Sequence, residues 1–438
     1  MTRQNLMDNV YLTYVPSEKF KTSFLSAQMV VPLAAETAGL NALLVNVLGR
    51  GTLRCPDMAA IARELDLLYG ARLEPSVRKK GENQTFGFVA SCVDDRLLPA
   101  GERLLEPLAD LMGEMFLSPA TRNGRLRGDY VDSERENLAD LIRSEINDKR
   151  SYAARRLIAE MCAGEPYGVS RLGEARGVER ISLHKLNSHY QALLPRARLE
   201  LFYCGSAPEK RVAGLFTRAF AALPRQGKQI EPAPTVRREA PAEPRVITEE
   251  MDVAQGKLGV GFRTMSDDGA ATMIMNSMFG GTSTSKLFLN VREKLSLCYY
   301  AGSSYHRKKG LITVSSGIET KNYQRALDEI MTQLEALRRG EWEDWELEGA
   351  RSSLRNPAVH GGLRLGAGGL HHGPDGHRKR RDHPRPALRR RGGDPGACPP
   401  GGGAGAAGYD LFSQGKGGGG MSVQEYPKLG ERVTRLRL

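Results

Sequence analysis

Hydrophobic positions in the first 223 residues follow two different periods, which predicts a unit of mixed α and β structure. We expect strands where apolar and polar residues alternate, and helices where apolar residues recur every three or four positions. The expected strands are 9–15, 24–31, 72–78, 85–92 and 199–204, and the expected helices are 40–48, 56–68, 97–116, 130–162, 182–193 and 208–223. The Lys80-Gly81-Glu82-Asn83 turn joins two of these strands into a hairpin.

A similar order of elements recurs after a proline-rich stretch. Residues 224–246 are rich in Pro, Glu and Arg, which is typical of an extended linker. Beyond it we expect strands at 258–262, 297–305 and 311–318, and helices at 270–278, 283–294 and 323–337. The sequence therefore predicts three parts: an N-terminal domain (1–223), the linker (224–246) and a C-terminal domain (247–438).

Two short matches at nearly equal spacing indicate that the two domains are copies of one another. Val77-Arg78-Lys79-Lys80-Gly81 resembles His306-Arg307-Lys308-Lys309-Gly310 at an offset of 229 residues (306 − 77). Gly51-Thr52 matches Gly281-Thr282 at an offset of 230 (281 − 51). Short Lys-Gly turns also recur by chance, which is the alternative, but the shared order of elements favours a duplication.

The segment 356–420 breaks this pattern. It is crowded with Gly, Pro, Arg and His, and it holds five of the eight histidines. Three interpretations compete: an Arg/Gly-rich nucleic-acid arm, a His-rich metal-binding tract, and out-of-frame translation of a GC-rich gene. We favour the third, because the segment stands where the repeat requires helices and a closing strand, and because it has few aromatic residues for stacking on bases. Ordered sequence is expected to resume near residue 423.

The net charge of +12 does not by itself indicate a function for the folded part of the chain. Residues 364–391 hold nine Lys or Arg and two Asp, a net +7 that is more than half of the total, so nucleic acid is not the expected partner. The chain shows neither a run of about 18 apolar residues nor an apolar signal-peptide core. Its six cysteines lack C-x-x-C spacing, which is typical of reduced thiols. We therefore expect a cytoplasmic protein without a membrane segment.

The most informative motif is the helical stretch 39–52, which reads G-L-N-A-L-L-V-N-V-L-G-R-G-T. It resembles the helix that carries H-x-x-E-H in the M16, or insulinase-like, zinc peptidases. On that pattern the first zinc-ligating histidine falls on Ala42, the general-base glutamate on Val45 and the second histidine on Asn46. Zinc needs two imidazoles four residues apart, and its bound water needs a carboxylate beside it. The methyl group of Ala42, the isopropyl group of Val45 and the amide of Asn46 provide neither the imidazoles nor the carboxylate. The family's third ligand, a glutamate, falls on Leu141.

The resemblance to the M16 family covers about residues 10–355. Further segments that carry it are Phe116-Leu117-Ser118-Pro119, Glu134-Arg135-Glu136-Asn137-Leu138, Pro166-Tyr167-Gly168, Leu172-Gly173, Gly280-Gly281-Thr282-Ser283-Thr284-Ser285-Lys286-Leu287-Phe288 and Val291-Arg292-Glu293-Lys294. The resemblance implies an α+β fold of two homologous M16-type (LuxS/MPP-like) units, each a mainly antiparallel sheet with helices packed on it.

The same family uses an arginine, and a tyrosine seven residues later, to hold the substrate backbone. Here these are Arg292 and Tyr299, and a guanidinium offers forked donors to peptide carbonyl groups. The resemblance implies that Gly280 and Gly281 shape a loop beside them. The residues alone leave a simpler interpretation open, in which Arg292 pairs with a neighbouring acid, Tyr299 packs in a strand and the glycines end a helix.

Other histidines do not suggest a second zinc site. His184 and His189 are five residues apart and fall on different faces of a helix, so we expect both on the helix surface.

Within the family, the chain most resembles the bacterial group associated with 5-aminopentanol modification of elongation factor P. The segments that carry this are Asn147-Asp148-Lys149, Tyr152, Arg156-Leu157-Ile158 and Glu160-Met161-Cys162. The resemblance implies a non-catalytic subunit that binds a peptide or protein substrate and completes the site of a sister M16 peptidase, with zinc only in that sister. Two alternatives stay open: a scaffold without substrate contact, and an active metallopeptidase with an unrecognised zinc site.

Overall fold

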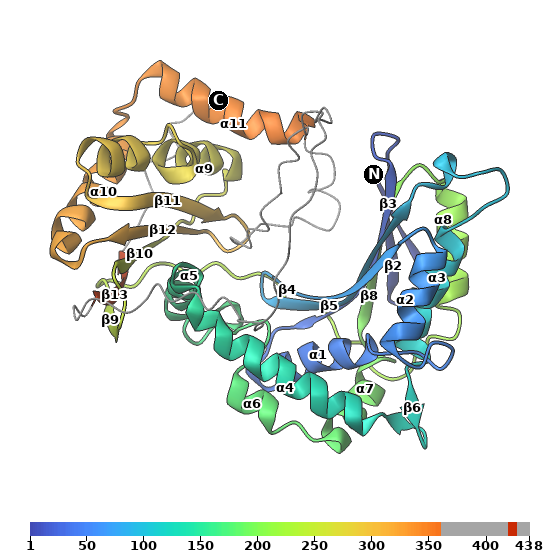
Figure 1. The fold of residues 1–438 in the computed structure, drawn as a ribbon. Helices are drawn as coiled ribbons and strands as arrows, with labels where there is room; N and C mark the ends of the chain where they lie inside the picture. The colour runs from blue at the N-terminus through green and yellow to red at the C-terminus, as the bar shows by residue number, and fades with distance from the viewer. Residues whose placement is uncertain (361–418, 427–438) are drawn as a thin grey trace, which may run out of the picture.

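A computed structural model describes residues 1–360 and 419–426 of the chain, and these residues form two large sheets with helices packed on them (Figure 1). The larger sheet has six strands in the order β1-β2-β8-β3-β5-β4, and all neighbours are antiparallel except β2 and β8. Its strands are β1 (Thr2–Met7), β2 (Val10–Pro16), β3 (Thr22–Pro32), β4 (Arg72–Lys80), β5 (Asn83–Val93) and β8 (Arg198–Gly205). The α+β fold class predicted from the sequence is confirmed.

The helices of the N-terminal half, except α5, pack around this sheet and enclose the larger hydrophobic core. The helices of this half are α1 (Ala35–Leu48), α2 (Met58–Leu67), α3 (Leu105–Leu117), α4 (Gly128–Ser144), α5 (Lys149–Met161), α6 (Ala175–Glu179), α7 (Leu183–Leu193) and α8 (Glu209–Ala219), with a small hairpin of β6 (Thr121–Arg122) and β7 (Arg125–Leu126). Three aromatic rings tie β5, α3 and the end of α8 together: Phe88 lies 5.3 Å from Phe116, which lies 5.8 Å from Phe220. Such contacts between ring edges and faces stabilise a core beyond the apolar area they bury.

The second sheet belongs to the C-terminal half and has five strands in the order β11-β12-β10-β13-β9. Its strands are β9 (Val246–Met251), β10 (Gly256–Arg263), β11 (Cys298–His306), β12 (Leu311–Ile318) and β13 (Gly419–Tyr426), and its helices are α9 (Gly269–Asn276), α10 (Tyr323–Arg339) and α11 (Asp344–His360). β13 lies between β10 and β9, parallel to the first and antiparallel to the second. Ordered structure near residue 423 was expected. The interpretations of segment 356–420 remain predictions, since residues 361–418 lie outside the described ranges.

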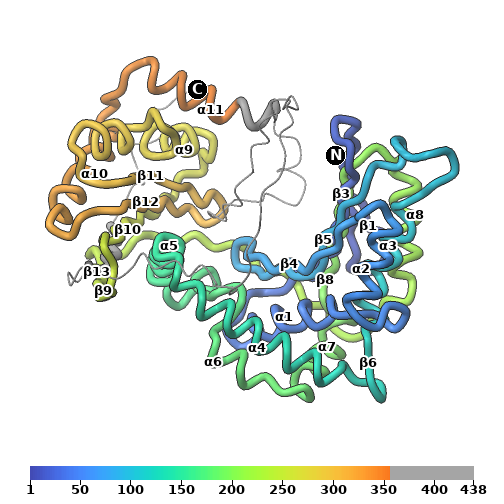
Figure 2. The backbone as a smooth tube through the Cα atoms, in the orientation of Figure 1, coloured from blue at the N-terminus to red at the C-terminus, as the bar shows by residue number. Residues whose placement is uncertain are grey.

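The expected helix at 130–162 is wrong, because the structure divides it into two. α4 ends at Ser144, a single 3-10 turn follows, and α5 begins at Lys149. The side chain of Asp148 causes the new start, since its carboxylate accepts hydrogen bonds from the backbone N–H groups of Arg150 and Ser151, both at 3.1 Å. The break redirects the chain, and α5 leaves the N-terminal half to pack beneath the second sheet (Figure 2).

Two further expectations need correction. The helix expected at 97–116 begins only at Leu105, because residues before it form a 3-10 turn and a loop through Gly101, whose φ is +95°. The strands β1 and β9 were not expected. Both lie at sheet edges, and in the described structure neither has a buried residue, so the signal of a buried strand face is missing from their sequences.

The two halves meet at a buried cluster of four charged side chains, which we call the inter-half cluster: Glu82, Glu165, Arg263 and Lys309. None of the four side chains is more than 5% exposed. Lys309, in the turn between β11 and β12, contacts Glu82 in the turn between β4 and β5 and lies 2.5 Å from Glu165. Arg263 donates to Glu165 at 2.7 Å. Two carboxylates and two cations balance, so the cluster buries no net charge.

Hydrogen bonding explains why Glu165 stays charged inside the protein. Burial acts to raise the pKa of this carboxyl, but hydrogen bonds from Lys309 and Arg263 outweigh it and lower the pKa below its usual range. The linker joins the same junction, because Lys309 also donates to the carbonyl oxygen of Val236 at 2.5 Å.

Apolar contact reinforces this junction. Leu157, Met161 and Cys162, at the end of α5, form a small buried cluster with Leu311 of β12. Gly261 of β10 permits the close approach, since a Cβ atom there would lie 2.2 Å from the Met161 sulfur. None of the helices within residues 1–360 is both long and apolar enough to cross a membrane.

Replacing Lys309 by Met tests the inter-half cluster. The change leaves Glu82 and Glu165 buried without their shared cation, and the removal of one partner from a buried ion pair costs about 3–5 kcal/mol. We expect a lower urea concentration at the midpoint of unfolding, measured by tyrosine fluorescence and circular dichroism. The control is Lys321→Met, whose pair with Glu319 is solvent-exposed and whose loss should leave the midpoint unchanged. Equal midpoints for the two variants would contradict the prediction.

Candidate functional site

The helix that resembles the zinc-binding helix is buried on most of its surface. Ala42 and Val45 of α1 are 0% and 1% exposed, and Asn46 is partly buried. α1 contacts the first sheet at β4 and β5 and the helices α4, α6 and α7. Among the residues that the structure describes, no group of three or more His, Cys, Asp or Glu could hold a metal ion.

Leu141 does not lie in a buried site, because its side chain is 52% exposed on α4. The acid of α4 that reaches the end of α1 is Glu134, whose carboxylate lies 2.8 Å from the Arg50 guanidinium. Arg50 also lies over the Tyr130 ring, 5.0 Å from its centre. An ion pair therefore joins the end of α1 to α4, and sequence reasoning missed it because the two residues are 84 positions apart.

A buried chain of polar side chains lies beside the degenerate positions. Asn41 donates to Gln84 at 2.7 Å, and its own carbonyl oxygen lies 2.6 Å from His189 Nε2. Because the Asn41 amide nitrogen is used toward Gln84, its oxygen is the acceptor, and His189 must carry its proton on Nε2. Gln84 donates in turn to the backbone oxygens of Ala38 and Arg171. This network ties α1, β5 and α7 together.

The expectation of a surface role for His189 is therefore wrong. The ring is partly buried and hydrogen-bonded, and burial first, then the nearby charge of Lys185, lowers its pKa below the ordinary value. His184, at the other predicted position, is exposed on α7. The signal that could have found the network is the buried Asn41 within an otherwise apolar helix, since a buried amide needs partners.

Arg292 and Tyr299 line one pocket of about 350 Å³ in the C-terminal half. Its lining residues are Arg292, Glu293, Ser296, Leu297, Cys298, Tyr299, Glu319 and Asn322. Arg292 lies in a π-helical segment (Leu287–Lys294), and the expected α-helix at 283–294 takes this wider form from residue 287. Tyr299 follows on β11, one of the two edge strands of the second sheet. The structure thus brings the two expected substrate-binding side chains to one concave surface.

The local backbone presents both side chains outward. Ser296 has a φ of +50°, which is uncommon for a residue with a side chain. The register of β11 with β12 then shifts between Cys298 and Tyr300, which leaves Tyr299 in a bulge. Bulges re-aim side chains, and Tyr299 is 56% exposed rather than packed in the strand. Burial of the neighbouring Cys298 raises the pKa of its thiol, so it is no candidate nucleophile.

The guanidinium of Arg292 can donate hydrogen bonds to a further acceptor. Its guanidinium stacks over Phe288 at 4.7 Å, and its Nε lies 3.5 Å from Glu293, a long and exposed pair. The simpler interpretation, a pairing with a neighbouring acid, is thus partly met. Forked Nη donors of a guanidinium can bind peptide carbonyl oxygens or a carboxylate.

Gly280 and Gly281 do not line this pocket. They end a π-helical turn (Ser277–Gly281), and Gly280 is buried against β11. A Cβ atom on Gly280 would lie 2.6 Å from the Ser303 nitrogen, so close packing requires a glycine there. A direct role in shaping a substrate loop stays a prediction for both residues.

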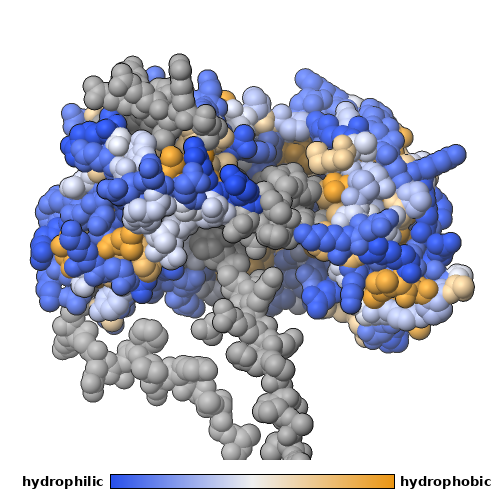
Figure 3. All heavy atoms as spheres, turned by 90° about the horizontal axis from the view of Figure 1, so that it is seen from above, coloured by the Kyte–Doolittle hydropathy of each residue, from blue (hydrophilic) through white to orange (hydrophobic). Residues whose placement is uncertain are grey.

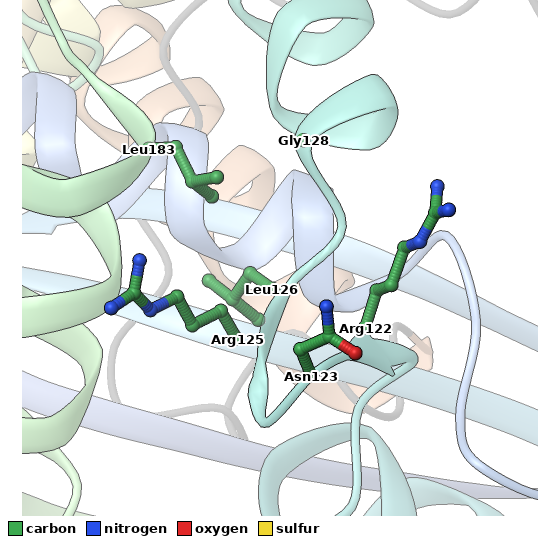
Figure 4. Close-up of a pocket in the computed structure, with 6 residues that line it drawn as sticks. All are labelled: Arg122, Asn123, Arg125, Leu126, Gly128 and Leu183. Carbon is green, nitrogen blue, oxygen red and sulfur yellow. The ribbon is translucent and has the colours of Figure 1, made fainter.

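A second pocket of similar size lies at the β6–β7 hairpin and is lined by Arg122, Asn123, Arg125, Leu126, Gly128 and Leu183 (Figure 4). The two guanidinium groups point away from each other on opposite sides of the hairpin. Their charges do not converge on one point, so this pocket is a weaker candidate than the Arg292–Tyr299 pocket.

Comparison with known proteins agrees with the fold and the motifs. The family model described as the Peptidase M16 inactive domain matches residues 180–354. A probable inactive metalloprotease of Bacillus subtilis, YmfF, is 35% identical over 349 residues, which cover 79% of this chain and 81% of the relative. The chain belongs to the M16 peptidase family. It is a homologue of the inactive members of that family.

Other M16 relatives and solved structures share less sequence. An uncharacterized zinc protease of Mycobacterium tuberculosis is 25% identical over 267 residues, covering 59% of this chain and 58% of the relative. A conserved protein from Enterococcus faecalis superposes with a TM-score of 0.72 at 28% identity, covering 82% of this chain and 84% of that chain. A peptidase M16 inactive domain from Pseudomonas fluorescens has the same fold, with a TM-score of 0.62 at 14% identity and coverage of 82% and 84%.

The absence of zinc ligands at the M16 positions leads to a metal prediction. The purified, tag-free chain should keep far less than one tightly held zinc per molecule after dialysis against a mild chelator, because Ala42, Val45 and Asn46 offer no imidazole or carboxylate. Elemental analysis by mass spectrometry measures this. Stoichiometric zinc that resists the chelator would contradict it.

The network around His189 predicts a pH dependence of stability. The unfolded ring titrates near 6.5, and the folded ring has a lower pKa. Stability is therefore complete above pH 6.5 and falls as the pH drops through the folded pKa, because the folded state must charge a buried ring. We expect the thermal midpoint to fall more between pH 7.5 and 5.0 in the wild type than in His189→Gln. His184→Gln, at an exposed position, should keep the wild-type dependence; a parallel fall in all three proteins would refute the assignment.

Proposed function

We propose that this chain is a non-catalytic M16 subunit that binds a peptide or protein substrate and completes the site of a sister M16 peptidase. The observation that carries the proposal is the shared pocket of Arg292, which is partly exposed, and Tyr299, which is exposed. In this arrangement the sister supplies the zinc and the general base, and this chain supplies donors that hold the substrate backbone.

The pocket suits a peptide backbone more than an apolar ligand. Arg292 offers forked N–H donors and Tyr299 a phenol donor for carbonyl oxygens, while Glu293, Glu319 and Asn322 can accept from N–H groups. β11 is an edge strand, and edge strands are where an extended peptide can add to a sheet. Held in this way, a substrate is oriented before reaction, which lowers the entropic cost of catalysis.

The arrangement of strands supports the proposed duplication into domains 1–223 and 247–438. Read from the hairpin edge, β4-β5-β3-β8-β2 corresponds in order to β11-β12-β10-β13-β9. Both hairpins turn at a glycine of positive φ, Gly81 and Gly310. One strand departs from the correspondence: β8 is antiparallel to β3, whereas β13 is parallel to β10.

A role beside elongation factor P modification, in the cytoplasm, belongs to the same proposal. It rests on the sequence resemblance of residues 147–162. Several of those residues have structural tasks here: Asp148 caps α5, and Tyr152 and Arg156 both bind Glu249 of the second sheet. These structural roles do not identify the reaction step.

Substitution of Arg292 distinguishes substrate binding from a scaffold role. We expect Arg292→Ala to assemble normally with the M16 peptidase that co-purifies with the native protein, and to lower hydrolysis of a quenched-fluorescent peptide library by roughly tenfold or more, because charge-assisted hydrogen bonds contribute about 1.5–3 kcal/mol. The matched control is Arg339→Ala, an exposed arginine outside the pocket. Full activity of Arg292→Ala would favour the scaffold, and failure of any M16 protein to co-purify would contradict the partner role.

A further inference from the structure

The linker between the two halves is docked on the protein at several points. Ile230 forms a parallel bridge with Ala197, just before β8. Three residues later, the backbone of Ala233 exchanges two hydrogen bonds with the side chain of Asn83, both of 2.7 Å. The amide of Asn83 uses one donor and its acceptor for a single linker residue, much as a neighbouring strand would. These contacts hold the first part of the linker on the N-terminal half.

The next residues pass from one hairpin turn to the other. Thr235 packs beside Gly81 in the turn between β4 and β5, where a Cβ atom would collide with the Thr235 hydroxyl. The carbonyl oxygen of Val236 accepts a hydrogen bond at 2.5 Å from Lys309, in the turn between β11 and β12. These two turns lie beside each other between the sheets (Figure 1). Two successive linker residues therefore contact turns of different halves.

Arg237 fixes the linker on the C-terminal half. Its guanidinium donates to the carbonyl oxygen of Ser266 at 2.7 Å and to that of Arg307 at 3.0 Å. Ser266 lies in the loop between β10 and α9, and Arg307 follows the end of β11. Hydrogen bonds from a charged donor are stronger than those between neutral groups. One side chain thus joins the linker to two loops of this half.

The apolar contact between the halves is small by comparison. The buried apolar cluster that joins them consists of Leu157, Met161, Cys162 and Leu311. On the face shown in Figure 3, hydrophilic side chains cover most of both halves. Domains move relative to each other unless the interface between them is large and hydrophobic. A fixed arrangement of these halves therefore needs polar contacts, which the inter-half cluster and the linker supply.

We propose that residues 230–237, which we call the strap, lock the two halves into one rigid body through their noncovalent contacts. A linker that acts only as a tether keeps two domains near each other and leaves their orientation free. The strap instead grips both hairpin turns, so the Arg292–Tyr299 pocket keeps one position relative to the first sheet. A consequence, which rests on the proposed function, is that the movement that admits a substrate takes place between the two subunits and not within this chain.

Cleavage of the linker beyond the strap tests the proposal. A recognition site for a sequence-specific protease, inserted between Ala242 and Glu243, lets the full-length chain be cut after it has folded, because both residues are exposed. The strap then stays on the N-terminal fragment and keeps its contacts with the C-terminal half. We expect the two fragments to elute together in gel filtration, at the volume of the uncut chain. Separation of the fragments at micromolar concentration would overturn the proposal.

Substitutions distinguish the strap from the inter-half cluster, which also joins the two fragments. Arg237→Ala removes two hydrogen bonds to the C-terminal half, and Asn83→Ala removes the two that hold the strap on the N-terminal half. In the cut chain, each should weaken the association of the fragments by about tenfold or more. Gel filtration over a range of protein concentrations, at one low urea concentration, measures this association.

Lys228→Ala is the matched control, because Lys228 is an exposed cation of the same linker whose backbone oxygen, not its side chain, accepts a hydrogen bond from Arg196. It should leave the association unchanged, and circular dichroism of the uncut variants should show that each one folds. Fragments of Arg237→Ala and Asn83→Ala that associate as tightly as those of Lys228→Ala would overturn the proposal. The readout is association and not activity, so its failure is distinct from a failure of the proposed function, which Arg292→Ala tests.

Discussion

The inter-half cluster of Glu82, Glu165, Arg263 and Lys309 is the contact on which the arrangement of the two halves depends. Each half contributes charges that it cannot neutralise alone: two carboxylates come from the N-terminal half and two cations from the second sheet and its hairpin turn. Buried charges are costly unless paired, so each half supplies the partners that let the charges of the other stay buried at the junction. The cluster fixes the halves in one orientation, and α5 and the linker extend the same junction.

That fixed junction has a consequence for how an M16 body works without a peptidase centre. The helix α1 has lost the chemistry of a zinc site but not its packing. Its apolar residues fill the core, and Asn41 exchanges hydrogen bonds with Gln84 and His189. The position of α1 therefore rests on apolar packing and on this hydrogen-bond network. In the proposed function, this body serves as a surface that binds a substrate and a sister peptidase.

The candidate binding surface depends on backbone geometry more than on charge alone. Arg292 and Tyr299 are seven residues apart, in a π-helical segment and a bulged strand. A positive φ at Ser296 and the register shift beside Tyr299 turn both side chains toward one pocket. A regular helix and a regular strand would direct the tyrosine differently, because side chains of a strand alternate between its faces.

By itself the sequence determined the α+β class, most helices and strands of both halves, and the loss of zinc ligands at Ala42, Val45 and Asn46, because these follow from local periodicity and residue chemistry. It also indicated Arg292 and Tyr299 through a motif. Only the tertiary structure decided that residues 130–162 divide at Asp148, that His189 and Asn41 meet, that Glu134 rather than Leu141 reaches α1, and that Lys309 joins Glu82. Those outcomes depend on groups that are distant in the chain. A side chain's partners there are set by packing, which no local pattern records.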